Sequence, residues 1–311
     1  MPDIILHHYP ESPFSEKIRL LLGYKGVAYN SVIIPVMMPK PDLMPLTGGY
    51  RKTPVMQIGA DIYCDSAIIA RTIDDLYPQN SIYPRHCEAV AGALAHWTDT
   101  FLFKVAVAVA FQPRGLANNA ILSDAETAAA FAADRAELTK GSSELRLALE
   151  IAEPFFIQHL ARLNSQLGEG AGFLFGDAPT IADFSTYHCL WFVHNNEVLR
   201  QIFAPYPEVN QWMSRMAGLG QAEAHDMSGK EALAIAKDAV PIKRSTVIDV
   251  EGPGAGDDVE VMPIDYGFNP VAGKLRVSSF EEIVLARQDE QLGQVAVHFP
   301  RLGFEVRRAR A

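Results

Sequence analysis

The spacing of the hydrophobic positions changes twice along this chain, and each spacing predicts a different kind of structure. In residues 1–80, short apolar runs alternate with turn residues, which indicates strands interleaved with helices. In residues 84–220, alanine-rich stretches with helical spacing predict a bundle of helices, at Glu88–Phe111, Ala125–Lys140 and Leu145–Leu167. Short apolar runs return after residue 240. The pattern therefore predicts an α/β domain, an all-helical domain and a small, mainly β extension.

Residues 221–240 have a helical pattern, and we expect them to link the helical domain to the extension at 241–311. The segment 289–293 ends in glycine, as a hairpin loop does. A β unit of this size buries little apolar surface by itself. We therefore expect it to lean on the helical domain or on a partner subunit. Its predicted strands are Thr246–Val250, Val259–Met262, Lys274–Val277, Glu282–Ala286, Gln294–His298 and Phe304–Val306.

The first apolar run, at residues 4–6, is followed by Ser12-Pro13-Phe14-Ser15 and then by a helical pattern. A strand, a turn and a helix in this order bring free backbone N–H groups and the helix dipole to one point, which favours an anion. A redox protein of the thioredoxin type would carry Cys-x-x-Cys here, whereas this chain has serine at both sulfur positions. Ser12 is also a good helix cap, and Pro13 is a favoured first helical residue. The tetrapeptide by itself leaves an anion site and a simple helix start open.

Two further motifs lie at predicted strand ends. Thr53-Pro54 opens the strand Val55–Ile58, and Asp65-Ser66 opens the helix after the next strand. An X-Pro bond can be cis, and a cis bond would turn the amide N–H and carbonyl of Thr53 toward an extended, peptide-like ligand. Taken alone, Asp65 and Ser66 fit a helix cap equally well. Thr180-x-x-Asp183 is a capping box, and we expect it to serve folding rather than catalysis.

Three motifs occur in order at ordinary spacing: Tyr9-Pro10-Glu11-Ser12-Pro13-Phe14, Lys52-Thr53-Pro54-Val55 and Asp65-Ser66-Ala67-Ile68. With the strands and helices predicted around them, they resemble the thioredoxin-like N-terminal domain of the glutathione transferase superfamily. The likeness is closest to the serine- and cysteine-type classes, such as zeta and omega, with serine where omega has cysteine. It covers about residues 1–220, so the β extension lies outside it.

The resemblance implies glutathione as co-substrate and no metal. Ser12 would donate a hydrogen bond to the glutathione sulfur and stabilise its thiolate. Asp65 would face the γ-glutamyl ammonium, and Ser66 the γ-glutamyl carboxylate. A basic residue would meet the glycyl carboxylate, with Lys40 preferred over Lys52. The implied site consists of Ser12 as the catalytic residue and of Lys40, Thr53, Pro54, Asp65 and Ser66 as glutathione-binding residues.

Two classes of function stay open at this point. The first is an enzyme that activates glutathione for attack on, or isomerisation of, a small hydrophobic electrophile. The second is a glutathione-binding or scaffolding protein with little turnover, whose β extension recruits a partner. Glutathione-dependent disulfide reduction is disfavoured, because it usually needs cysteine at position 12. The resemblance also implies a homodimer.

Composition narrows the class of protein further. The chain has 27 basic and 37 acidic residues, a net charge of −10, which argues against a nucleic-acid partner. Three scattered cysteines argue against a disulfide framework. The adjacent His7 and His8 would face opposite sides of a strand and are poorly placed to share a metal. The apolar run at 101–111 is too short to span a bilayer. With no signal peptide visible, we expect a soluble cytoplasmic protein that does not bind membranes.

Overall fold

The computed structural model describes residues 2–116, 122, 124–170, 172–244, 246–247 and 252–309. Its first part is a thioredoxin-like unit in which β1 lies between β2 and β3, and β3 pairs with β4. β1 runs parallel to β2 and antiparallel to β3, and β4 runs antiparallel to β3. The elements are β1 (Ile5–His8), α1 (Pro13–Lys25), β2 (Tyr29–Ile33), α2 (Met44–Thr47), β3 (Val55–Ile58), β4 (Asp61–Cys64) and α3 (Ser66–Leu76).

The helices α1 and α3 begin where the sequence predicts. The Ser12 hydroxyl accepts a hydrogen bond from the Ser15 N–H and caps α1, and Pro13 is the first helical residue. Gly26, at φ +64°, ends α1 in the left-handed conformation that favours glycine. Asp65 caps α3 by accepting from the Ala67 N–H. Apolar residues of both helices join one buried core with the helical domain.

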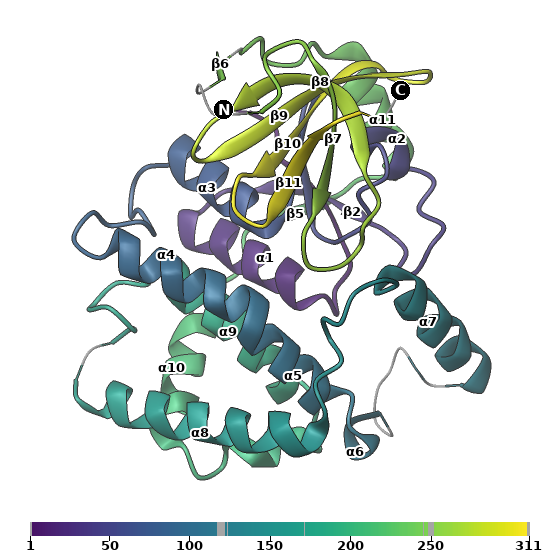
Figure 1. Ribbon diagram of the computed structural model, residues 1–311. Helices are drawn as coiled ribbons and strands as arrows, with labels where there is room; N and C mark the ends of the chain where they lie inside the picture. Colours follow the sequence, from purple (N-terminus) through teal and green to yellow (C-terminus); the bar gives the residue numbers. More distant parts are fainter. Residues whose placement is uncertain are drawn as a thin grey trace.

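The helical domain lies below α1 in Figure 1, with α9 in its core. The capping box is present as predicted: Asp183 accepts from the Thr180 N–H, and its second oxygen accepts from the Leu174 N–H and the Trp212 indole. The predicted bundle is confirmed, with shorter helices than expected. They are α4 (Glu88–Trp97), α5 (Phe103–Ala110), α6 (Pro113–Leu116), α7 (Ala125–Leu138), α8 (Leu149–Gly168), α9 (Ile181–His194) and α10 (Pro207–Ala217).

The predicted helix Glu88–Phe111 contains a π-helical turn, Thr98–Leu102, between α4 and α5. The whole stretch Glu88–Ala110 is 23 residues long and apolar enough to cross a membrane by length and composition. In this structure Val105, Ala106 and Val109 are fully buried in the bundle. The second half of the stretch thus lies in the core of the helical domain, as the sequence predicts for residues 101–111.

The segment 221–240 differs from the prediction in its first half. It contains a short strand, β5 (Ala224–Asp226), before α11 (Gly229–Asp238). β5 pairs in parallel with the outer edge of β2. The helix begins only at residue 229 because Ser228 and Glu231 form a capping box there. A free sheet edge thus overrides the helical pattern of residues 221–228.

The β extension continues the thioredoxin-like sheet. Residues 293–300 pair in parallel with β4, and the strand order is β11-β7-β8-β9-β10-β4-β3-β1-β2-β5, with β6 beside β8. In Figure 1 these strands, yellow and light green, lie at the end of the molecule away from α8 and α10. The predicted hairpin at 289–293 joins β9 to β10. The strands are β6 (Thr246–Val247), β7 (Asp258–Pro263), β8 (Val271–Ser278), β9 (Glu282–Asp289), β10 (Gly293–Pro300) and β11 (Phe304–Arg308); residues 248–250 of the first predicted strand lie outside the described residues.

The expectation that this extension leans on the helical domain misses its main support, the thioredoxin-like unit, and a contact with a partner subunit stays a prediction. Its apolar side chains share a second core with residues of β1, β3, β4 and α2 on the other face of the sheet. Arg287 of β9 donates to the carbonyl of Pro45 in α2, and Tyr50 packs edge-on against Phe299 of β10. The free edge of β4 and the exposed apolar face beneath it supply the surface that the extension buries.

Candidate functional site

One edge of the sheet brings the three motifs together. His7 pairs with Val55, and Val55 pairs with Cys64. Because β3 runs antiparallel to both β1 and β4, the end of β1, the start of β3 and the end of β4 lie side by side. We call this row of strand ends the sheet edge of the candidate site. The loop that carries Ser12, the Thr53-Pro54 step and the Asp65-Ser66 cap therefore gather at that edge. The Thr53-Pro54 bond is cis, as the sequence suggests.

Ser12 is 2% exposed at the start of α1. Its oxygen accepts the Ser15 N–H at 3.2 Å, so the helix-cap interpretation is confirmed. Capping uses a lone pair of the hydroxyl and leaves its proton available to a second partner. The cap and the proposed donor role are therefore compatible, and the helix N-terminus lies behind the same oxygen.

Asp65 and Ser66 sit where β4 gives way to α3. Burial raises the pKa of the Asp65 carboxyl, although the Ala67 N–H and the charges of Lys52 and Lys17 oppose that rise. A raised carboxyl pKa means that the ionised form lacks solvation, and a cation at this position would stabilise it. Asp65 has φ +100°, and Ser66 is 4% exposed with its hydroxyl 3.5 Å from the Lys17 ammonium.

Lys40 lies at the other side of Thr53, with 3% of its surface exposed. Its ammonium donates to the Thr53 hydroxyl and to the Arg51 carbonyl, each at 3.1 Å. Burial, together with the positive charges of Arg135 and Arg51, lowers the pKa of Lys40 from 10.5 to about 8. Cations that lower the pKa of a neighbouring cation in this way favour the binding of an anion at the same place.

Two further residues near Ser12 have no role in the predicted site: Tyr9, which belongs to the first motif, and Arg135, which belongs to none. Burial raises the pKa of the Tyr9 phenol, and the Arg135 charge and hydrogen bonding by Ser12 partly oppose the rise. Arg135, near the end of α7, donates to the Val36 carbonyl at 2.8 Å. Arg51 forms an ion pair with Asp134 of the same helix. The helical domain thus places both an arginine and an aspartate next to the sheet edge.

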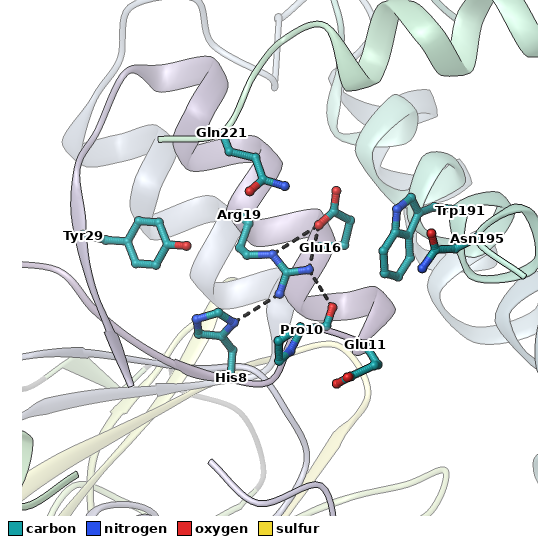
Figure 2. Close-up of a pocket in the computed structure, with 9 residues that line it drawn as sticks. All are labelled: His8, Pro10, Glu11, Glu16, Arg19, Tyr29, Trp191, Asn195 and Gln221. Carbon is teal, nitrogen blue, oxygen red and sulfur yellow. Dashed lines mark hydrogen bonds and ion pairs between the residues drawn. The ribbon is translucent and has the colours of Figure 1, made fainter. Parts of the chain in front are cut away.

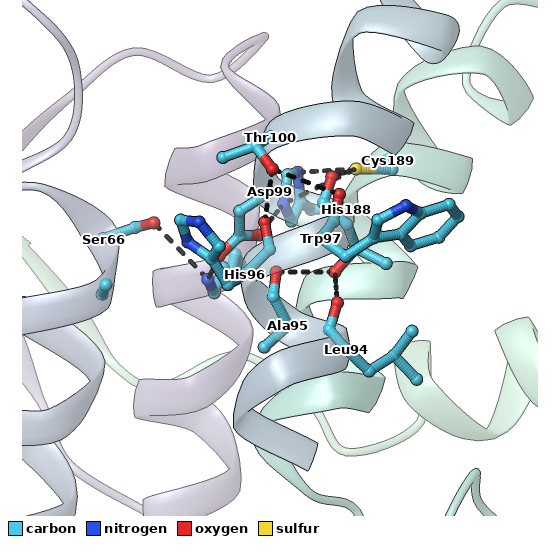
Figure 3. A network of polar contacts seen from close by, with 12 residues as sticks. Ser66, Leu94, Ala95, His96, Trp97, Asp99, Thr100, His188 and Cys189 are labelled. Carbon is cyan, nitrogen blue, oxygen red and sulfur yellow. Dashed lines mark hydrogen bonds and ion pairs between the residues drawn. The ribbon is translucent and has the colours of Figure 1, made fainter. Parts of the chain in front are cut away.

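A second buried network reaches from Ser66, at the start of α3, to Asp99 and His188 of the helical domain (Figure 3). Lys17 of α1, only 1% exposed, donates to Asp99 at 2.6 Å, and His188 of α9 lies 2.8 Å from the other Asp99 oxygen. Against burial, which raises it, the Lys17 charge and the His188 hydrogen bond hold the pKa of Asp99 at about 2. Asp99 belongs to the π-helical turn, a feature often found near functional sites. This network joins α1 of the thioredoxin-like unit to the helical domain next to Ser66.

A row of half-buried aromatic rings runs from Phe14, next to Ser12, into the helical domain. The Phe14 and Phe103 ring centres are 4.7 Å apart, and Phe103 is followed by Phe192 at 6.5 Å. Phe111 lies 5.9 Å from Phe192, and Phe131 of α7 lies 5.8 Å from Phe111. These rings offer an apolar surface beside the sheet edge, whereas the edge itself is polar.

Figure 2 shows a cavity of about 570 Å³ that borders α1. It shares the Pro10-Glu11 loop with Ser12, but none of the predicted site residues lines it. Arg19 in this cavity is already paired: it bonds Glu16 at 2.7 Å, His8 at 3.1 Å and the Pro10 carbonyl at 2.9 Å. A matched, hydrogen-bonded cation has little left to offer an anionic ligand, so we place the candidate site at the sheet edge rather than here.

Lys52, the alternative partner for a carboxylate, faces the β extension. Its ammonium donates to Asp265 at 2.7 Å and lies 3.8 Å from the centre of the Tyr266 ring. Sequence reasoning gave no signal for this contact, because the partners are 213 residues apart. Lys17 could have been found, since a lysine inside an apolar helical stripe requires a buried counter-charge.

Comparison with known proteins gives the same architecture. Residues 6–81 match the family described as Glutathione S-transferase, N-terminal domain, and residues 153–215 match Glutathione S-transferase, C-terminal domain. A GST-like protein from Pseudomonas syringae has a TM-score of 0.83 and 41% identity, covering 99% of this chain and 100% of that one. The β extension is thus part of that alignment.

More distant structures share the fold. A tau class glutathione S-transferase from mango, Mangifera indica, has a TM-score of 0.51 and 17% identity, covering 69% of this chain and 88% of that one. A glutathione S-transferase from Methylobacillus flagellatus, with GSH bound, has a TM-score of 0.52 and 16% identity, covering 70% and 97%. Glutathione S-transferase U4 of Arabidopsis thaliana is 28% identical over 83 residues, which span 27% of this chain and only 37% of that relative.

Fold and sequence together define a thioredoxin-like domain joined to a helical bundle, the two-domain class in which glutathione transferases fall. The chain belongs to the glutathione transferase superfamily. It carries in addition the β extension that completes its sheet.

Proposed function

We propose that this protein binds glutathione at the sheet edge and activates its thiolate for transfer to a small hydrophobic electrophile. The observation that carries the proposal is a pair of charged side chains, Asp65 and Lys40, that form no ion pair among the described residues. Asp65 has a raised carboxyl pKa and favours a cation, whereas Lys40 has a lowered ammonium pKa and favours an anion. Glutathione carries an ammonium at its γ-glutamyl end and a carboxylate at its glycyl end, so it would relieve both.

Ser12 would then face the cysteinyl sulfur between these two ends. A free thiol has a pKa near 8.5, and lowering it by about two units corresponds to about 2.7 kcal/mol. One hydrogen bond to a charged group, with the N-terminus of α1 behind it, supplies a free energy of this size. Ser12 acts here as a donor to the thiolate, and its own oxygen does not attack the substrate.

The electrophile would occupy the aromatic row that begins at Phe14. That row adjoins Ser12, and its rings are half-buried, so a flat apolar substrate would find stacking partners next to the thiolate. The scaffolding alternative receives less support, because the β extension is built into the core of the thioredoxin-like unit and is not a separate recruiting module. A metal-free mechanism and a cytoplasmic location stay predictions.

A homodimer is also still a prediction. Light scattering at micromolar concentration should give a particle of twice the chain mass, as most soluble oligomers are two-fold symmetric. A particle with the mass of one chain would contradict it.

Calorimetric titration with glutathione tests the binding site. Asp65→Asn keeps the helix cap and tolerates the positive φ, but it removes the charge that would face the ligand ammonium. We expect it to weaken glutathione binding at least about tenfold, since a charge-assisted hydrogen bond contributes about 1.5–3 kcal/mol. Asp238→Ala, at the exposed end of α11, is the matched control and should bind as wild type does. Unchanged affinity in Asp65→Asn would remove the proposed site.

A further inference from the structure

The loop between β7 and β8, residues 264–270, leaves the sheet and reaches the helical domain. The Gly267 N–H donates to the Leu138 carbonyl at the end of α7, at 2.9 Å. The Ser142 hydroxyl donates to the Asp265 carbonyl at 2.5 Å. The Asp265 carboxylate in turn receives the Lys52 ammonium at 2.7 Å. This loop is therefore tied both to the bundle and to the segment before β3 that carries Thr53.

Tyr266, at the centre of the loop, packs against Lys52, the residue before Thr53. Its ring lies over the Lys52 ammonium, with 3.8 Å between the nitrogen and the ring centre. Burial raises the pKa of the Tyr266 phenol, and the negative charges of Asp265 and Asp65 raise it further, while Arg135 lowers it. The charges of Asp65 and Arg135 thus both act on the phenol.

These contacts also assign a role to Lys52. The Lys52 charge is paired with Asp265, whereas within the described part of the chain the Lys40 ammonium forms no ion pair and donates to the neutral Thr53 hydroxyl and Arg51 carbonyl. Of the two lysines considered for the glycyl carboxylate, Lys40 is thus the better candidate for an ion pair with it. Lys52 anchors the loop.

We propose that Tyr266 is a substrate-binding residue, and that the β7–β8 loop forms a wall of the glutathione site held in place by the Lys52–Asp265 ion pair. This inference rests on the proposed function, because it takes glutathione as the ligand. The ring would cover the peptide of the bound tripeptide between Asp65 and Arg135, and exclude water from it. The C-terminal extension would then contribute directly to a site that the first 80 residues otherwise build.

Titration of the full-length chain with glutathione tests the wall. Tyr266→Ala removes the ring, and we expect binding about tenfold weaker, the effect of losing one large aromatic contact. Tyr266→Phe keeps the ring and should stay within about threefold of wild type. Ile264→Ala is the matched control, since this side chain of the same loop is 65% exposed and should not matter. In a transferase assay, Tyr266→Ala should raise KM for glutathione and leave kcat at saturation within about twofold.

The anchor has its own test. Asp265→Ala and Lys52→Met should each weaken glutathione binding, and the double variant should be no weaker than the weaker single, because the pair acts as a unit. Tighter binding by Asp265→Ala would mean that the loop blocks the site, and it would overturn the wall. Hydrogen exchange on wild type adds a readout without mutation: residues 264–270 should exchange more slowly with saturating glutathione.

The outcomes separate the two proposals. Wild type that binds glutathione while Tyr266→Ala binds equally well, with unchanged exchange in the loop, overturns only the role of Tyr266. Wild type that fails to bind glutathione overturns the proposed function, and the wall with it.

Discussion

Two groups of buried charges adjoin the sheet edge, and they differ in whether the charges are matched. In the first, Lys17 and His188 both contact the Asp99 carboxylate at hydrogen-bond distance. In the second, the charges that act on Lys40 are two arginines, Arg135 and Arg51, against the single carboxylate of Asp134. Charges matched within the chain stabilise the fold, whereas an excess of one sign destabilises it until a ligand supplies the other. On this ground we propose that the second group takes part in binding the ligand.

The largest effect is expected from breaking the matched group. Lys17→Met leaves the Asp99 carboxylate buried beside His188 without its cation, which should lower the free energy of unfolding by about 3–5 kcal/mol. Urea denaturation followed by circular dichroism measures this change. If the variant loses less than about 1 kcal/mol, the network is not the structural element that we infer.

Ser12→Ala probes the chemistry that lies between the two groups. We expect transfer to a chloronitrobenzene to slow by about 100-fold, equivalent to about 2.7 kcal/mol, and the pKa of bound glutathione to return toward its free value. Thiolate absorbance and steady-state kinetics report the two quantities. Ser12→Thr retains a hydroxyl and a cap and serves as the control. Equal thiol pKa and rate in wild type and Ser12→Ala would leave Ser12 as a helix cap alone.

Removing the unmatched cation should have a small effect on stability and a larger one on binding. Burial disfavours the charged form of Lys40, so Lys40→Met stabilises the fold by removing the cost of burying that charge. The same change destabilises it, because the Arg51 carbonyl and the Thr53 hydroxyl lose their hydrogen-bond donor. These terms oppose each other, and we expect the free energy of unfolding to stay within about 1 kcal/mol of wild type. Glutathione binding should nevertheless weaken. A destabilisation as large as that of Lys17→Met would contradict the comparison.

The smallest expected effect is the uptake of protons when the ligand binds. In the free protein the pKa of Lys40 is about 8, below its ordinary 10.5, so the folded state loses this proton first as pH rises. Lys40 therefore makes the fold relatively more stable as pH increases from 8 to 10.5, where the unfolded chain binds more protons. A bound carboxylate raises this pKa again, and binding at pH 8 should take up as much as about half a proton.

Calorimetry in buffers of different ionisation enthalpy measures that uptake. S-methylglutathione is the suitable ligand, because it has no thiol proton to release. The difference between wild type and Lys40→Met isolates the contribution of Lys40 from that of the ligand amine. Equal uptake in the two proteins would place the glycyl carboxylate elsewhere.

The sequence predicts the parts of the site that depend on local signals. Ser12 and Asp65-Ser66 each mark the start of a helix and Thr53-Pro54 the start of a strand, and strand order then brings them to one edge. Lys40 is preferred over Lys52 from its position; Lys52 is paired with Asp265, and which lysine meets the glycyl carboxylate stays a prediction. Whether these residues bind glutathione is still to be measured.

The remaining features depend on pairings that local patterns do not encode. The short strand at 224–226 forms because β2 has a free edge, although its own pattern favours helix. Arg135 and Tyr266 reach the site from α7 and from the β7–β8 loop, and neither lies in a motif. The extension was recognised as β structure, but its pairing with β4 could not be predicted from strand propensity alone, since propensity does not choose a partner.

That pairing has a consequence for how the protein is made. β10 joins β4 through residues such as His298 and Asp61, which lie 237 positions apart and bond at 2.9 Å. During synthesis from the N-terminus, the thioredoxin-like part emerges first, with one strand edge and one apolar face uncovered. It must wait for nearly the whole chain before β10 can close that edge. A chain that terminates before residue 293 would therefore keep an exposed strand edge of the kind that promotes aggregation.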